Sequence, residues 1–250
     1  MPKLTQAVKH LIIINTLFFI ATYYIIDSRI LIEWFSLFST ESPFFKYWQV
    51  ATSMFMHGSF SHILFNMFAL WMFGSTLESV WGTKKFITFY FLTGIGSAIL
   101  YLLIKYIQIQ YVIDDYSAEE INIVLTKGAE AIMNGKNFTD ENLANLNALI
   151  NTPTLGASGA ISGLLMAFGV LFPNVELMLI FIPIPIKAKY FIPLLIVYEL
   201  TMELAGFSWD NIAHLGHLSG MIIGYILIKY WKKINSNSVN FTFVKRFHIK

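Results

Sequence analysis

The sequence contains no cysteine, and only 13% of its 250 residues are charged. The missing cysteine excludes disulfides, thiolate nucleophiles and cysteine-ligated metal centres. The charged fraction is about half of the roughly 25% typical of soluble proteins, whereas hydrophobic residues make up 56% of the chain. A chain of this composition belongs in a lipid bilayer, and its length is that of a single domain.

Apolar runs that approach the ~20 residues needed to cross a bilayer recur along the chain. Three prolines, Pro183, Pro185 and Pro193, interrupt the fifth run, so its start could lie nearer Leu177. The six predicted spans cover residues 11–26, 60–80, 86–104, 155–172, 190–207 and 212–231. The predicted fold class is therefore an all-α membrane protein, with a six-span membrane domain over residues 1–233.

Lysine and arginine near the ends of spans mark the cytoplasmic side. With the N-terminus inside, most of the 17 basic residues fall on that side, and residues 234–250 form a basic cytoplasmic tail. Both termini are then cytoplasmic. The first apolar run has no small-residue cleavage site, so we expect a retained anchor, and no Arg- and Ser-rich leader is present, which favours the bacterial plasma membrane.

Residues 107–153 break the apolar pattern, because they are polar and acidic. We expect them to form an insertion outside the membrane, between the third and fourth spans. Ser117 followed by Glu120 has the form of a capping box, and apolar residues recur after it at helical spacing. This pattern predicts an amphipathic helix, and a second helix is expected at about 140–150.

Polar residues gather at one end of the predicted bundle. With the N-terminus inside, the second, fourth and sixth spans all enter the membrane from the outer face. Ionisable and polar residues within a membrane are costly, which makes them candidates for a functional site. Those at the outer ends of the three spans are His57, His62, Asn66, Ser158, His214 and His217. We expect them to form one site in the outer leaflet.

The fourth span opens with Gly156-Ala157-Ser158-Gly159. Flanking glycines leave a serine hydroxyl accessible for nucleophilic attack, although small residues at this spacing also serve simply to pack membrane helices. In the sixth span His217, Gly220 and Gly224 share one helix face, which suits close packing against a glycine-lined neighbour. A histidine at that contact could take the serine proton, or could merely be hydrogen-bonded between helices.

His62 and Asn66 lie four residues apart and project from one face of the second span. Both can donate hydrogen bonds to an oxyanion, and both could instead join neighbouring helices. Four outer histidines also permit a metal site, but no cysteine or H-E-x-x-H helix accompanies them. An aspartyl protease would need paired aspartates within its spans, whereas the aspartates here lie in loops or at span ends.

These motifs, in this order, resemble those of the rhomboid intramembrane serine proteases. The matching elements are His62-Ile63-Leu64-Phe65-Asn66, then Gly156-Ala157-Ser158-Gly159, then His217-x-x-Gly220-x-x-x-Gly224, and Glu78-x-x-x-Gly82 also looks like the family's pattern. The resemblance covers roughly residues 8–231. It implies a six-helix fold that cleaves transmembrane segments of other proteins near the outer leaflet, without a cofactor, a metal or a nucleic-acid partner.

The resemblance also implies the roles of individual residues. Ser158 would attack the scissile carbonyl, and His217 would shuttle the proton in a dyad that has no aspartate. His62, Asn66 and the backbone N–H of Ser158 would bind the oxyanion. The glycines that support this arrangement are Gly156, Gly159, Gly220 and Gly224. Without a carboxylate, the imidazole of His217 is expected to be oriented by packing.

The sequence departs from the family pattern at two positions. Ser162 stands where many bacterial members carry an aromatic residue that stacks on the histidine, and Trp48-Gln49 replaces the Trp-Arg of the first outer loop. Two other functions compete with proteolysis. One is a catalytically silent rhomboid-like protein that binds membrane segments, although this chain retains both the serine and the histidine. The other is a transporter or channel, which would need a polar path through the inner leaflet.

Overall fold

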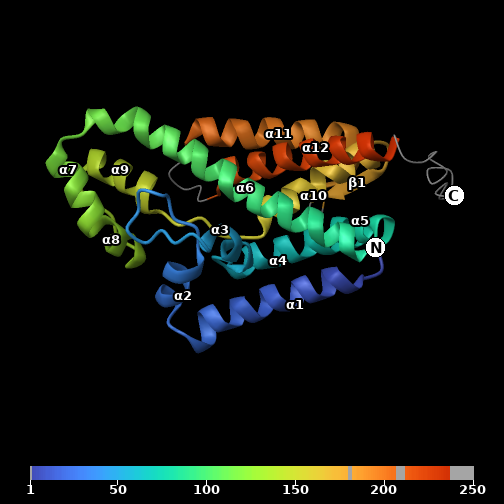
Figure 1. Ribbon diagram of the computed structural model, residues 1–250, viewed down its shortest axis with the longest axis horizontal. Coiled ribbons are helices and arrows are strands. Elements are labelled where there is room, and N and C mark those ends of the chain that lie inside the picture. The colour runs from blue at the N-terminus through green and yellow to red at the C-terminus, as the bar shows by residue number, and fades with distance from the viewer. Residues whose placement is uncertain (1, 180–181, 207–211, 237–250) are drawn as a thin grey trace.

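The computed structural model describes residues 2–179, 182–206 and 212–236, and within them the chain is a helical bundle with one β-hairpin. Most of the long helices run along the same axis (Figure 1). Helix α10 packs against α4, α6, α11 and α12, so the serine-bearing helix is central. The bundle helices are α1 (Gln6–Ile20), α4 (Phe60–Ala69), α5 (Ser75–Trp81), α6 (Thr83–Val112), α10 (Ser158–Leu171), α11 (Ala188–Ala205) and α12 (His214–Ser236).

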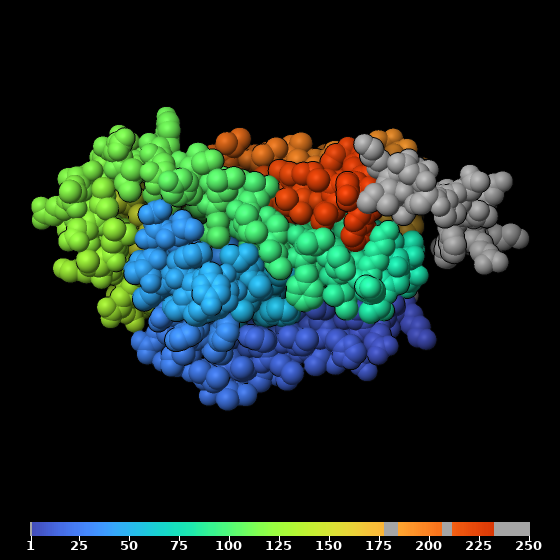
Figure 2. Space-filling view, in the orientation of Figure 1, coloured from blue at the N-terminus to red at the C-terminus, as the bar shows by residue number. Residues whose placement is uncertain are grey.

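Short helical segments complete the structure. The N-terminal end of α1 lies at one end of the molecule, and the segment predicted as an insertion, residues 107–153, forms the opposite end (Figures 1 and 2). Its first helix has the predicted capping box between Ser117 and Glu120. The remaining helical segments are η1 (Ala21–Ile25), α2 (Ser28–Phe35), α3 (Gln49–Thr52), η2 (Ser53–Phe55), η3 (Leu70–Gly74), η4 (Ile113–Asp115), α7 (Ala118–Ile123), η5 (Val124–Gly128), α8 (Ala129–Met133) and α9 (Glu141–Asn151).

Helices occur at all six places where the sequence predicts a span. Three segments in the described part of the chain are long and apolar enough to cross a membrane: Gln6–Ile25, Phe60–Trp81 and Thr83–Asp115. Ser158–Leu171 is a shorter apolar helix. The protein is therefore a membrane protein with several candidate spans, and the count of six stays a prediction. Most of the predicted tail, 234–250, lies outside the described residues.

The region around the prolines differs from one expectation. Residues Glu176–Leu179 (β1) and Ile182–Lys187 (β2) form an antiparallel hairpin, and α11 begins only at Ala188. The alternative start of the fifth helix near Leu177 is therefore wrong. Proline lacks the N–H that an interior helical position requires, which excludes the segment around Pro183 and Pro185 from a regular helix.

Glycines bring α10 and α12 into backbone contact. A Cβ atom added to Gly220 would lie 2.0 Å from the carbonyl oxygen of Gly159, and one added to Gly224 would lie 2.7 Å from Cα of Gly163. No side chain fits at either crossing, so the two helices approach as closely as their backbones permit. This contact fixes the turn of α12 that carries His217 beside the first turn of α10.

Glu78, in α5, ties its end of the bundle to the start of α1. Its buried carboxylate accepts hydrogen bonds from the backbone N–H groups of Ala7 and Val8, at 3.0 and 3.1 Å, and from the hydroxyls of Thr5 and Thr83. The first N–H groups of a helix have no partner within the helix, so Glu78 caps α1 from a distant part of the chain.

Gln49 organises the first loop, the segment between α1 and α4. Its side-chain oxygen accepts from the N–H groups of Phe38 and Lys46, and its amide nitrogen donates to the carbonyls of Glu33 and Phe44. A fully buried neutral amide thus holds the loop where many family members have an arginine. The departure at Trp48-Gln49 changes the charge of this position while leaving it a centre of hydrogen bonds.

Candidate active site

Ser158 is the first residue of α10 and is only partly buried. Gly156, two residues earlier, has a φ of +127°, a backbone conformation that residues other than glycine rarely adopt. Its N–H donates a hydrogen bond to the carbonyl of Ser53 at 2.9 Å. This turn presents the serine at the helix N-terminus. Backbone N–H groups in the first helical turn lack intrahelical acceptors and carry partial positive charge, so they suit a developing oxyanion.

His217 lies one turn into α12, beside the contact of Gly220 with Gly159. Its Nδ1 is 3.0 Å from Oε1 of Glu199, a residue of α11. A carboxylate oxygen accepts a hydrogen bond, so Nδ1 of the neutral imidazole carries the proton and Nε2 has a free lone pair. This is the tautomer that a general base needs. In the described part of the chain no hydrogen bond joins Ser158 Oγ to His217, and such bonds often tighten only when substrate binds.

Glu199 corrects the expectation that packing alone orients His217. The second carboxylate oxygen, Oε2, lies 2.5 Å from Nδ1 of His214, so one carboxylate holds two imidazoles. The Glu199 side chain is only 8% exposed, and that of His214 is 4% exposed. None of the sequence motifs includes Glu199. Its signal was present, because Glu199 is an acidic residue in the middle of the predicted fifth span.

His62 and Ser158 flank the same glycine. A Cβ atom on Gly156 would lie 2.7 Å from His62 Nε2 and 3.6 Å from Ser158 Oγ. The N–H of Gly58 donates to His62 Nδ1 at 3.4 Å, which leaves Nε2 of the neutral ring as the protonated nitrogen. His62 therefore presents a hydrogen-bond donor toward the turn that carries the serine.

Asn66 lies one turn beyond His62 and is buried. Its side-chain nitrogen donates to the carbonyl of His62 at 3.0 Å, so in this structure its amide engages its own helix. Ser162 is also buried, one turn below Ser158 in α10. The hydrogen bond that His217 Nδ1–H donates to Glu199, rather than an aromatic residue at position 162, is what fixes the imidazole of His217.

His57 precedes the Phe60–Trp81 segment and is 2% exposed. Its ring lies 5.0 Å from that of His62, centroid to centroid, so the structure brings these two predicted residues together. Burial, and then the charge of His62, lower the pKa of His57 from 6.5 to about 3. His57 is therefore uncharged at neutral pH, and it lies next to His62 at the edge of the site.

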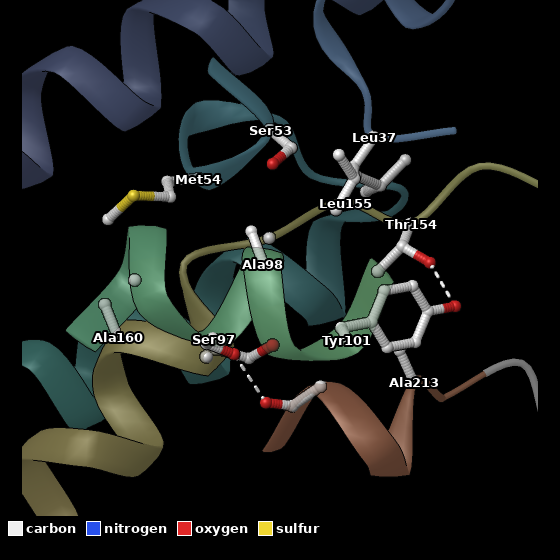
Figure 3. A pocket seen from close by; sticks show the side chains of 15 residues that line it. Leu37, Ser53, Met54, Ser97, Ala98, Tyr101, Thr154, Leu155, Ala160 and Ala213 are labelled. Carbon is white, nitrogen blue, oxygen red and sulfur yellow. Dashed lines mark hydrogen bonds between the residues drawn. The ribbon is translucent and has the colours of Figure 1, made fainter. Parts of the chain in front are cut away.

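A cavity of about 40 Å³ adjoins Ser158 (Figure 3). Residues of α6, α10, the first loop and the segment before Ser158 line it, and hydroxyl groups face it from several sides. Thr154 donates to the Tyr101 hydroxyl at 2.8 Å, and Ser97 donates to the carbonyl of Gly216 at 2.7 Å (Figure 3). A cavity of this size has room for a small number of water molecules, and the hydroxyl groups that face it offer hydrogen-bond partners.

Three potential metal donors lie together in the site. Atoms of Glu199, His214 and His217 all fall within 4.8 Å of one another. Both histidine Nδ1 atoms are directed at carboxylate oxygens at hydrogen-bond distances, so we interpret the group as a hydrogen-bonded network. The four histidines considered from the sequence do not form this group, since only His214 and His217 belong to it.

The chain matches known proteins over most of its length. The family model of the rhomboid domain matches residues 45–233. Rhomboid protein 1, mitochondrial, of Saccharomyces cerevisiae is 26% identical over 181 residues, which cover 72% of this chain and 41% of that protein. Presenilin-associated rhomboid-like protein, mitochondrial, of Mus musculus is 24% identical over 201 residues, 74% of this chain and 42% of that protein.

A third relative matches a shorter segment. Rhomboid-like protease 3 of Toxoplasma gondii is 34% identical over 61 residues, which cover 24% of this chain and 23% of that protein. The chain thus spans about half or less of the length of these curated relatives. Two of the three are named mitochondrial, so the comparisons give no support to the expected bacterial plasma membrane.

Proposed function

Because the chain belongs to the rhomboid family, we propose that it is an intramembrane serine endopeptidase that cleaves transmembrane segments of other proteins. The observation that carries the proposal is the pair of groups at the crossing of α10 and α12. Ser158, which is only partly buried, is the first residue of α10. His217 lies on the adjoining turn of α12. Its Nδ1–H donates a hydrogen bond to Glu199, which leaves Nε2 unprotonated.

In the proposed reaction Ser158 Oγ attacks the scissile carbonyl carbon while its proton passes to Nε2 of His217. The tetrahedral intermediate then collapses, the C–N bond breaks, and the imidazolium gives the proton to the leaving amine. Water next attacks the acyl-enzyme, and His217 again takes and returns the proton. The cavity beside Ser158 supports this second step, because it offers space for water next to the acylated oxygen.

Donors for the oxyanion converge on the turn before Ser158. We assign the role to the backbone N–H of Ser158 and to Nε2–H of His62, which faces Gly156. Preorganised donors of this kind are typically worth about 3–4 kcal/mol each in acyl transfer. Asn66 would join them after its amide turns away from the carbonyl of His62, or would act by holding the His62 turn.

We further propose six membrane spans, with both termini cytoplasmic and residues 107–153 on the outer side. The insertion lies at the end of the molecule opposite the N-terminal end of α1, which fits this topology (Figure 1). The chain has no native cysteine, so single cysteines report sidedness directly. In intact cells an impermeant maleimide should label Lys136→Cys but not Lys84→Cys, and the reverse pattern would invert the topology.

The direct test of the activity is cleavage in liposomes. The full chain, reconstituted with a panel of single-span reporter proteins, should cut at least one within its transmembrane segment near the outer boundary. Ser158→Ala and His217→Ala should abolish cleavage while both variants still unfold cooperatively, which shows that they are folded. Binding of reporters without cleavage by the wild type would favour the catalytically silent alternative. Full activity of Ser158→Ala would exclude Ser158 as the nucleophile.

A further inference from the structure

Glu199 is a buried carboxylate that the expected serine–histidine pair does not use. It lies in α11, and its two oxygens contact two different imidazoles of α12, Oε1 at 3.0 Å from His217 Nδ1 and Oε2 at 2.5 Å from His214 Nδ1. Leaving a carboxylate this deeply buried without donors would cost several kcal/mol. Two N–H donors offset that cost, and they also fix the carboxylate in one orientation.

We propose that Glu199 is a positioning residue for His217, so that the site works as a serine–histidine–glutamate triad in which His214 anchors the glutamate. This inference rests on the proposed function of Ser158 and His217. Glu199 keeps the proton of the neutral imidazole on Nδ1, directs Nε2 toward α10, and stabilises the positive charge that His217 gains during attack. The proton taken from Ser158 is held by His217 until the leaving amine accepts it, and it does not pass to Glu199.

His214 gives the glutamate its second hydrogen bond. A carboxylate held through one oxygen can still rotate about its terminal bond, whereas one held through both oxygens cannot rotate without breaking a hydrogen bond. The two imidazoles lie one turn apart on α12, with ring centroids 6.3 Å apart, which matches the reach of a single carboxylate. The titratable groups of the described elements that contact His217 or interact with it electrostatically are Glu199 of α11, His214 of α12 and His62 of α4.

The test uses a fluorophosphonate probe, which reacts with an activated serine and requires no knowledge of the substrate. The variants are Glu199→Gln, which keeps the shape and removes the charge, and Glu203→Gln, a matched control one turn further along α11. The labelling rate constant is measured from pH 5 to pH 9 on the full chain in detergent micelles. Thermal unfolding of each variant is followed in parallel.

We expect Glu199→Gln to lower the maximal labelling rate by about 10²-fold or more, since general-base catalysis typically contributes about 10²–10⁴-fold. The acid limb of the profile should move to lower pH, because the imidazolium has lost its carboxylate. Glu199→Asp should restore part of the rate and return the acid limb toward that of the wild type. Glu203→Gln should match the wild type. A merely structural role would reduce the labelled fraction without moving the acid limb.

Two results would overturn the inference. The first is a Glu199→Gln profile that coincides with that of Glu203→Gln while the wild type labels normally, which would leave the proposed function intact. The second is loss of labelling on treatment with EDTA and its recovery with Zn²⁺, which would make the three side chains a metal site. If Glu199→Gln does not fold, the labelling profile of Glu199→Asp tests the inference instead. The shorter side chain shifts the carboxylate, so a labelling rate equal to that of the wild type would contradict a positioning role. If the wild type itself does not label, the proposed function fails first.

Discussion

At the scale of single residues, the site depends on which nitrogen of each histidine carries a proton. Glu199 places the proton of His217 on Nδ1, and the N–H of Gly58 leaves that of His62 on Nε2. The two histidines are thereby suited to different work, one as a base and one as a donor. Neither assignment follows from the residue type alone. Each is set by a neighbour that is distant in sequence or in an adjoining turn.

His57 provides a prediction at this scale. Its pKa falls from 6.5 in the unfolded chain to about 3 in the fold, with burial as the main cause. The unfolded state therefore binds more protons between these values, so this contribution to stability is complete above pH 6.5 and declines as the pH falls. The slope is at most about 1.4 kcal/mol per pH unit for one proton. Thermal unfolding in micelles should thus depend less on pH, from 6.5 to 4, in His57→Gln than in the wild type. An equal pH dependence of thermal unfolding in the two proteins would contradict the lowered pKa of His57.

At the scale of secondary-structure elements, the crossing of α10 and α12 makes the site possible. Gly220 and Gly224 have no space for a side chain, whereas a Cβ atom on Gly216 would meet nothing closer than 3.6 Å. Position 216 therefore has space for a side chain whereas positions 220 and 224 do not, although all three glycines lie within three turns of one helix.

We expect Gly220→Ala to separate the two helices. Overpacking of this kind costs about 1–3 kcal/mol or more, and here the obstacle is backbone rather than a movable side chain. The thermal midpoint should fall by several degrees, and labelling of Ser158 should slow because His217 moves with its helix. Gly216→Ala is the matched control and should unfold at the wild-type temperature. Equal midpoints for the two variants would show that the crossing is looser than the structure indicates.

The elements also show how far the sequence alone reaches. Apolar runs predicted the positions of the six helices, and a capping box predicted α7, because both signals are local. The β-hairpin was missed, since an apolar run containing prolines has no clear period. Glu199 was missed for another reason. Its partners lie on the next helix, and only the packing of α11 against α12 reveals which polar groups it meets.

At the scale of the whole molecule, the apolar surface and the interior site both fit a hydrolase that works within a membrane, as proposed. Large apolar side chains remain exposed along α1 and α11, as expected for helices that face lipid. Ser158 lies within the bundle at the level where the helices meet the loops, beside a cavity with room for water. The proposed hydrolysis of peptide bonds within a membrane requires this combination of an apolar exterior and an interior cavity beside the nucleophile.

In the proposed mechanism His217 activates Ser158. Mass spectrometry of the full chain, after reaction with a fluorophosphonate at neutral pH, tests this role. We expect one modified residue, Ser158, in the wild type. We expect no modification in Ser158→Ala, loss of the modification in His217→Ala, and its retention, at a reduced rate, in His214→Ala. Modification of Ser158 at the wild-type rate in His217→Ala, or modification only at another serine, would exclude His217 as the base of Ser158.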